Sequence, residues 1–105
     1  MLTDVFYASV LKNTGEDMNY RTLERIVRGY SNHRRIQMLE LLNKTPELSV
    51  EEVASTLRIN YKTAAEHIRR LAISALVVKR NAGNSVRLKV SKRGDSILKF
   101  LRTLE

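Results

Sequence analysis

Basic side chains dominate the second half of this sequence, and their chemistry suits contact with a polyanion. Residues 58–105 carry twelve lysines and arginines against three acidic residues, whereas residues 1–57 carry seven against eight. The chain has a formal net charge of +8, and the stretch from Lys79 to Arg93 has six basic residues and no acidic one. Such segregation favours a nucleic acid or an acidic membrane surface as the partner. The alternative is a solvated cationic face.

One group of these side chains recurs at helical spacing between Tyr61 and Ile73. If Ala64 points inward, an advance of about 100° per residue places Lys62 and Arg69 on the opposite side. A helix with such an outer face fits the major groove of DNA, where its side chains reach base edges. The candidate DNA-contacting residues of this helix are Tyr61, Lys62, Thr63, Glu66, His67, Arg69 and Arg70.

Some of these residues have a second interpretation. Tyr61 contacts a phosphate or a base edge, or it covers the preceding turn. Glu66 accepts from the exocyclic amine of a cytosine, or it forms an ion pair, for which Arg70 at i+4 is better placed than Arg69. We favour the ion pair. We expect His67 to pack half-buried or to contact a phosphate, because no second histidine at helical spacing suits a metal site.

A second basic group flanks a predicted β-hairpin. Residues 76–80 and 86–90 read as strands, and Gly83 between them can take the positive φ of a turn. A cationic hairpin beside a DNA-binding helix lies along the backbone or reaches the minor groove. The candidate contacts here are Lys79, Arg80, Arg87 and Lys89. Arg34 and Arg35, near a helix start, contact the backbone or are solvated.

Apolar spacing and capping residues predict the elements that position these side chains. Asn32, Ser49, Asn60 and Ser91 are suited as N-caps, Ser49 within a capping box with Glu52, and Gly29 as a C-terminal cap. Helices are predicted over 2–12, 20–28, 32–43, 50–57, 61–73 and 91–103.

The predicted fold class is mainly α with a small β-hairpin: a winged helix-turn-helix with extra N- and C-terminal helices. Residues 1–105 form a single winged-helix domain, with an N-terminal helix and link (1–19), the core (20–93) and a C-terminal helix (91–105).

Five segments of the sequence resemble ArsR-like winged helix-turn-helix DNA-binding transcriptional regulators, over about residues 20–104. They are NHRRIQMLELL (32–42), VEEVASTL (50–57), TAAEHIRRL (63–71), ALV (75–77) and VSKRG (90–94). The resemblance implies that residues 61–73 are the recognition helix and that residues 77–90 are the wing. The sequence departs from the pattern at Ala75, where glycine is more common, and at Ala65, where a serine commonly contacts DNA.

These observations predict a sequence-specific double-stranded DNA-binding transcriptional regulator. The alternatives are an architectural nucleoid or chromatin protein and a winged-helix protein-interaction module of a replication or transcription assembly. No set of residues suggests catalysis, so we do not expect an enzyme. Cysteine is absent and the two histidines fall in different elements, so no metal or other cofactor is expected.

Two apolar stripes exceed what a minimal winged helix needs for its core, and they predict a homodimer. The candidate dimer-interface residues are Leu2, Val5, Phe6, Val10, Ile97, Leu98, Leu101 and Leu104. The longest mostly apolar run, residues 71–78, is too short for a membrane span. We therefore expect a soluble cytoplasmic protein, associated with the nucleoid, with no membrane partner.

Overall fold

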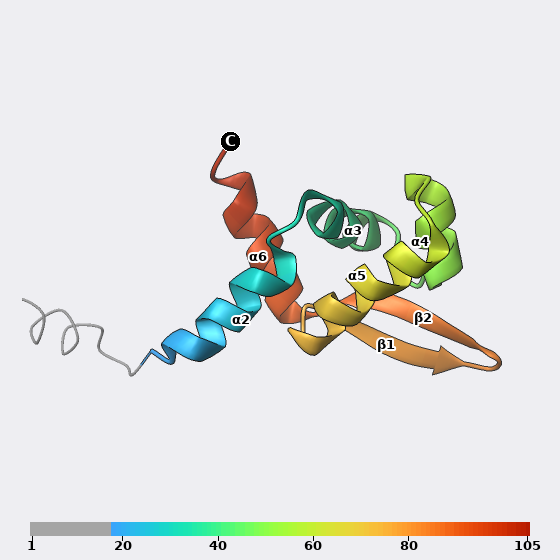
Figure 1. Ribbon diagram of the computed structural model, residues 1–105, viewed down its shortest axis with the longest axis horizontal. Helices are drawn as coiled ribbons and strands as arrows, with labels where there is room; N and C mark the ends of the chain where they lie inside the picture. Colours follow the sequence, from blue (N-terminus) through green and yellow to red (C-terminus); the bar gives the residue numbers. More distant parts are fainter. Residues whose placement is uncertain (1–17) are drawn as a thin grey trace, which may run out of the picture.

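The computed structural model describes residues 18–105, and this part of the chain is mainly helical with one antiparallel hairpin (Figure 1). The predicted helix over residues 2–12, with Leu2, Val5, Phe6 and Val10, lies outside the described residues. The elements are α2 (Tyr20–Tyr30), α3 (His33–Lys44), α4 (Val50–Leu57), α5 (Tyr61–Ile73), β1 (Val77–Ala82), β2 (Ser85–Val90) and α6 (Lys92–Arg102). This order confirms the predicted winged helix-turn-helix class, in which α4 and α5 are the helix-turn-helix and β1–β2 is the wing.

The polar residues predicted as N-caps all occupy that position. Asn32, Asn60 and Ser91 each accept hydrogen bonds from backbone amides of the first turn that follows them. Ser49 forms the complete capping box: its Oγ accepts from Glu52 N at 3.1 Å, and Glu52 Oε1 accepts from Ser49 N at 3.0 Å. These caps explain why α4 and α5 begin at the predicted residues.

The prediction that Gly29 caps α2 is wrong. The helix continues to Tyr30, Ser31 is the C-cap, and Gly29 is buried. A Cβ atom at Gly29 would overlap the side chain of Ser74, which follows α5. Glycine is therefore needed here for the close approach of two helices, not for the end of one.

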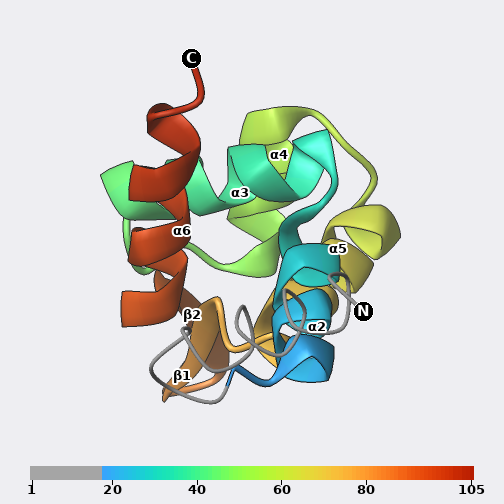
Figure 2. The same ribbon diagram turned by 90° about the vertical axis from the view of Figure 1, so that its left-hand side faces the viewer.

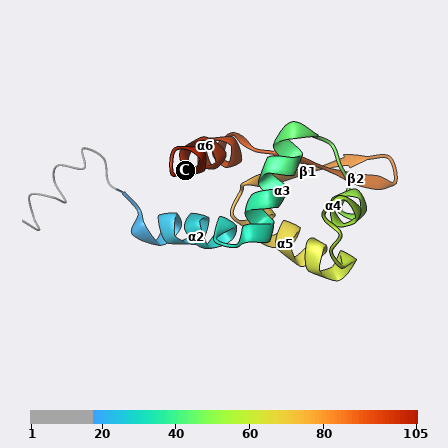
Figure 3. The same ribbon diagram turned by 90° about the horizontal axis from the view of Figure 1, so that it is seen from above.

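The core is built around α3. This helix contacts α2 and α5 on one side and α6 and β2 on the other, an arrangement visible in Figures 2 and 3. Its buried side chains pack against the predicted inward face of α5 and against the base of the hairpin. The fully buried large residues are Met38, Leu39, Leu42, Val53, Ile68, Leu71, Leu76 and Leu88. The core thus fixes both α5 and the base of the hairpin to the same helix.

The wing is longer and its turn is tighter than predicted. The strands pair from Val77↔Val90 to Ala82↔Ser85, so that a two-residue turn replaces the predicted five-residue loop. Gly83 takes the expected positive φ of 63°. The loop prediction failed because Asn81, Ala82 and Ser85 are weak strand formers that pairing with the opposite strand extends.

The link between α3 and α4 adds a short pairing to the outer side of β2. Leu48 forms a bridge with Leu88, whose amide donates to Leu48 O at 2.9 Å, while Glu47 N donates to Leu88 O at 2.8 Å. Glu47 has a left-handed φ of 72°. This link therefore lies directly against the wing and carries the Glu47 side chain to it.

Ala75 joins α5 to β1 in a left-handed conformation with φ of 58°. This region of backbone space is strained for a residue with a Cβ atom. The departure from glycine noted in the sequence therefore falls on a turn that glycine would fit without strain.

Candidate nucleic-acid interface

Helix α5 presents its predicted outer face to solvent. Ala64, Ile68 and Leu71 are buried against the core, and Tyr61 on the outer side is 56% exposed. The other outward residues, which are also exposed, are Lys62, Thr63, Glu66, Arg69 and Arg70. The helical periodicity therefore assigned both faces of this helix correctly.

Glu66 forms ion pairs with two arginines on this face. Arg69 donates from Nε at 2.8 Å and from Nη2 at 2.6 Å to the two carboxylate oxygens of Glu66, and Arg70 Nε donates at 3.2 Å. The favoured ion pair is present, but the preference for Arg70 over Arg69 was wrong, because i+3 geometry here gives Arg69 the bidentate contact. Hydrogen bonds from Arg69 lead the effects that lower the pKa of Glu66 to about 2.

His67 is half-buried, as expected, at the edge of α5 that faces α3. Its Nδ1 atom is buried and has no hydrogen-bond partner within residues 18–105. Burial, followed by the nearby positive charges of Arg35 and Arg70, lowers the pKa of His67. The side chain is therefore a neutral packing residue next to a cationic cluster at neutral pH.

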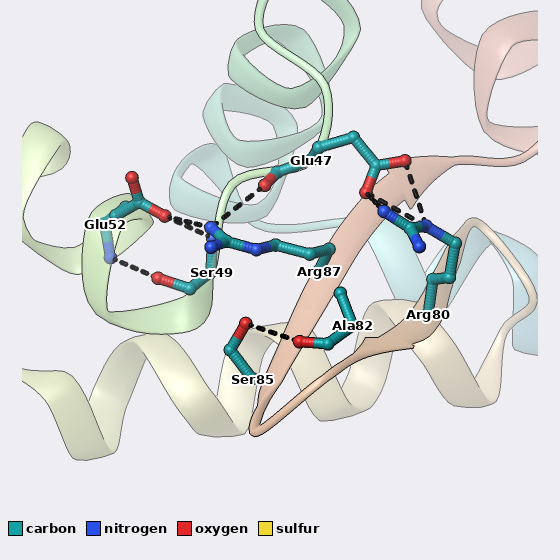
Figure 4. Close-up of polar contacts among 7 residues, drawn as sticks. All are labelled: Glu47, Ser49, Glu52, Arg80, Ala82, Ser85 and Arg87. Carbon is teal, nitrogen blue, oxygen red and sulfur yellow. Dashed lines mark hydrogen bonds and ion pairs between the residues drawn. The ribbon is translucent and has the colours of Figure 1, made fainter.

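Arg80 and Arg87 lie directly opposite each other on the two strands of the wing. Like charges at such positions repel, and in this protein each arginine has its own carboxylate (Figure 4). Arg80 donates from Nη2 to Glu47 at 2.9 Å and from Nε at 3.2 Å and 3.3 Å. Arg87 Nη1 donates to Glu52 at 2.8 Å and to the carbonyl oxygen of Glu47 at 3.4 Å. We call these four residues the wing clamp.

The wing clamp shifts the acidity of both carboxylates. Hydrogen bonds from Arg80 are the largest effect that lowers the pKa of Glu47. Hydrogen bonds from Ser49 in the capping box are the largest effect that lowers the pKa of Glu52, and Arg87 adds to it. Both glutamates are therefore ionised at neutral pH and compete with any external anion for the wing arginines.

The remaining predicted wing cations, Lys79 and Lys89, differ from the arginines. Both are exposed, and neither forms an ion pair with a residue in the 18–105 range. The structure thus separates the wing's four basic residues into two that hold the hairpin to the body and two that are available to an anionic partner.

A groove of about 550 Å³ separates the wing from the helix-turn-helix. Tyr61 lines it together with the start of α4 and the wing residues Asn84, Val86 and Arg87. Tyr61, the first residue of α5, thus faces the wing across this groove. Sequence reasoning missed Glu47 and Glu52 as parts of this region, because their role depends on the pairing of the 45–49 link with β2.

The predicted dimer-interface residues of α6 separate into two sets. Leu98 is buried in the chain's own core and is not available to a partner, so that its assignment was wrong; Ile97 also packs against the core. Leu104 is 64% exposed, and the unpredicted Phe100 is 52% exposed. Leu101 is half-buried. On α2, the apolar residues Leu23 and Val27 are also exposed.

Between residues 18 and 105, no three side chains of histidine, aspartate or glutamate come together in a way that could hold a metal ion. In the same range, no helix combines the length and apolar character needed to cross a membrane.

Comparison of the sequence with protein-family models gives no match, and comparison with curated proteins gives none either. Solved structures do match. The homodimeric winged helix-turn-helix DNA-binding domain of a possible ArsR-family transcriptional regulator from Mycobacterium bovis superimposes with a TM-score of 0.74 at 22% identity, over 81% of this chain and 79% of that one. HlyU from Vibrio cholerae matches with a TM-score of 0.72 and 26% sequence identity, over 85% of this chain and 97% of that one.

A third similar structure is the ArsR-like transcriptional regulator from Rhodococcus, with a TM-score of 0.66 and 25% identity over 81% of this chain and 77% of that chain. The order of α3, α4, α5 and the hairpin is the arrangement that the five sequence segments predicted. The resemblance drawn from those segments is thus confirmed at the level of structure: this chain has the winged helix-turn-helix fold of ArsR-like transcriptional regulators.

Proposed function

We propose that this protein is a sequence-specific double-stranded DNA-binding transcriptional regulator. In this proposal α5 enters the major groove, and the wing lies on the backbone or in the minor groove. The observation that carries it is the exposed face of α5, which begins with Tyr61, Lys62 and Thr63; Tyr61 lines the groove together with residues of the wing tip. The similar solved structures, which include transcriptional regulators, support the same function.

We expect the basic residues of α5 and of the wing to have different roles, because their contacts differ. Lys62 at the start of α5 forms no ion pair within residues 18–105, and both Lys62 and Thr63 are exposed, so they are available to base edges. Lys79 and Lys89 on the wing are available to phosphates, with release of counterions. Arg80 and Arg87 act first on the position of the wing, through the wing clamp.

A single experiment tests the proposed function. Bound sequences are selected from random duplexes, and affinity for the selected and for random DNA is then measured at two salt concentrations. We expect Lys62→Ala to weaken binding to the selected site more than to random DNA, whereas Lys89→Ala weakens both equally. Recovery of no preferred sequence, with equal losses for the two variants, would contradict the regulator and support an architectural protein.

One observation favours that architectural alternative. Glu66 engages Arg69 and Arg70, so two of the candidate base-reading side chains are already bonded to a carboxylate. A surface with few free base-reading groups and many cations binds DNA with a steep salt dependence and little preference. The selection experiment distinguishes the two functions directly.

We infer in addition that two copies of the chain act together. Helices α2 and α6 lie at the end of the molecule away from the wing tip (Figure 1). Leu23 and Val27 of α2, Phe100 of α6 and Leu104 just after α6 are exposed apolar side chains. Apolar surface of this kind favours a partner, and the similar domain from Mycobacterium bovis is a homodimer. A two-fold axis would place two α5 helices about 34 Å apart, one turn of DNA.

A further inference from the structure

Five arginines line one small cavity at the junction of α2, α3 and α5. The cavity has a volume of about 200 Å³. Its arginines come from three helices: Arg25 and Arg28 from α2, Arg35 from α3, and Arg69 and Arg70 from α5. No lysine and no carboxylate belongs to the lining. The candidate nucleic-acid interface does not explain such a concentration of one side chain, since it includes the α5 pair and, as one of two interpretations, Arg35, but neither arginine of α2.

Carboxylates neutralise only part of this charge. Glu66 serves Arg69 and Arg70 together, and Glu24 pairs with Arg28 at 3.1 Å. Within residues 18–105, neither Arg25 nor Arg35 forms an ion pair. Five guanidinium groups therefore share two carboxylates around one cavity, which leaves an excess of positive charge there.

The guanidinium group of Arg35 is held in place by hydrogen bonds to the backbone of α2. Its Nη1 donates to the carbonyl oxygens of Arg28 and Gly29, both at 3.2 Å, at the C-terminal end of α2. Its Nε atom is buried and has no partner in the described part of the chain. Burial and the neighbouring charge of Arg70 both lower the pKa of Arg35. A buried donor without an acceptor is unfavourable; since this atom is closed to solvent, the guanidinium group would have to turn toward the cavity for an anionic oxygen to accept from it.

The cavity's walls are fixed by close packing. The absence of a Cβ atom at Gly29 lets α2 approach the end of α5, where Ser74 Oγ donates to Arg25 O at 3.4 Å. The helices thus fix the backbone of every lining arginine, whereas the exposed side chains of Arg25, Arg28, Arg69 and Arg70 would still be ordered when an anion binds.

We propose that this cavity, which we call the arginine pocket, binds a phosphate group. Arginine forms bidentate hydrogen bonds with phosphate oxygens, and five arginines offer more donors than a carboxylate ligand would use. The volume accommodates a phosphate with a small substituent but not a large organic ligand. The phosphate belongs either to the DNA backbone beside α5 or to a small phosphorylated molecule; only the first source rests on the proposed function.

The first test uses the free protein and no DNA. Inorganic phosphate and pyrophosphate are titrated at constant ionic strength, and NMR follows the Arg35 Nε–H signal and the amides of residues 25–29 and 69–74. We expect saturable shifts that Arg25→Gln weakens about tenfold, as expected for one lost charge-assisted hydrogen bond. The matched control is Arg21→Gln, on the same helix but outside the pocket lining, which changes affinity less than twofold.

The second test identifies the source of the phosphate. If the DNA backbone supplies it, Arg25→Gln weakens binding to all duplexes more than Arg21→Gln does and lowers the salt slope by about one. If a small molecule supplies it, the two variants bind DNA equally and only the anion titration separates them. If both tests give identical results for the two variants, the proposal is overturned. If the wild-type protein binds no DNA, the proposed function is contradicted. The anion titration alone would then show whether the arginine pocket binds phosphate.

Discussion

Glu66 places a carboxylate between two guanidinium groups on a surface that is otherwise cationic. Its contacts with Arg69 and Arg70 fix both arginines in one orientation on the outer face of α5. A carboxylate at this position therefore orients the arginines and also opposes an approaching phosphate. An ion pair fully open to water is weak in salt solution, so DNA can displace it.

We expect Arg69→Gln to raise the pKa of Glu66 from about 2 toward the ordinary value of about 4.3. The lowered pKa means that the stabilising contacts of Glu66 are complete above the ordinary value and are lost as the pH falls toward 2. The variant should therefore lose less free energy of unfolding between pH 4.5 and 2 than the wild type does. NMR titration of the Glu66 carboxyl carbon measures the pKa, and an unchanged pKa would show that Arg69 does not hold the carboxylate in solution.

At the scale of elements, the wing clamp connects the hairpin to the segment that begins the helix-turn-helix. Glu47 reaches Arg80 from the link after α3, and Glu52 reaches Arg87 from the first turn of α4 (Figure 4). The orientation of the wing relative to α5 is thus set by charges as well as by the Leu48–Leu88 pairing. A phosphate that binds Arg80 or Arg87 must therefore compete with Glu47 or Glu52.

We expect Glu47→Gln to free Arg80 for DNA and to make the salt dependence of DNA binding steeper by about one phosphate contact. The matched control is Glu51→Gln, on α4, which removes the same charge but breaks no ion pair among the described residues. Affinity is measured over a range of salt concentrations. Equal slopes in the two variants would mean that only net charge matters and that the wing clamp has no role in binding.

The turn between α5 and β1 gives a second prediction at this scale. We expect Ala75→Gly to stabilise the protein by about 1 kcal/mol, because glycine relieves the left-handed strain at this position. Ala72→Gly, inside α5, should instead destabilise it by about 1 kcal/mol. Urea unfolding of the two variants measures both effects. A loss of stability in Ala75→Gly would show that the turn carries no strain.

The elements of this fold were largely predictable from local chemistry, whereas their contacts were not. Asn60 and Ser49 define helix starts through atoms two or three residues away, which a sequence displays directly. The ion pair of Arg80 with Glu47 spans 33 residues and depends on a bridge between a link and a strand. No periodicity encodes such a pairing, so the sequence predicted the same DNA contact for both wing arginines as for the wing lysines.

At the scale of the whole molecule, the exposed apolar side chains of α2 and α6 determine how two copies would meet. The apolar residues of α2 recur at helical spacing, and two of them, Leu23 and Val27, are exposed in the single chain. Periodicity shows that a helix has an apolar side but not whether its own chain or a partner covers that side. The inclusion of Leu98 in the interface failed for the same reason.

We expect Val27→Glu combined with Phe100→Glu to weaken dimerisation by at least about 100-fold, because each substitution would bury a charge at the proposed interface. Sedimentation equilibrium measures the association. Thr22→Glu, on the same helix and exposed, is the control and should leave the dimer intact. A dimer that survives the double substitution would show that the copies meet elsewhere.

The contact at Gly29 has a mechanical consequence for such a dimer. Here Gly29, on one of the helices proposed to join the two copies, lies directly against the side chain of Ser74 at the end of α5. Because these atoms touch, a shift of α2 at a dimer interface would have to be accompanied by a shift of the end of α5. The arginine pocket is lined by residues of both helices beside this contact, so an anion bound there would act on the same junction that joins the proposed dimer helix to α5.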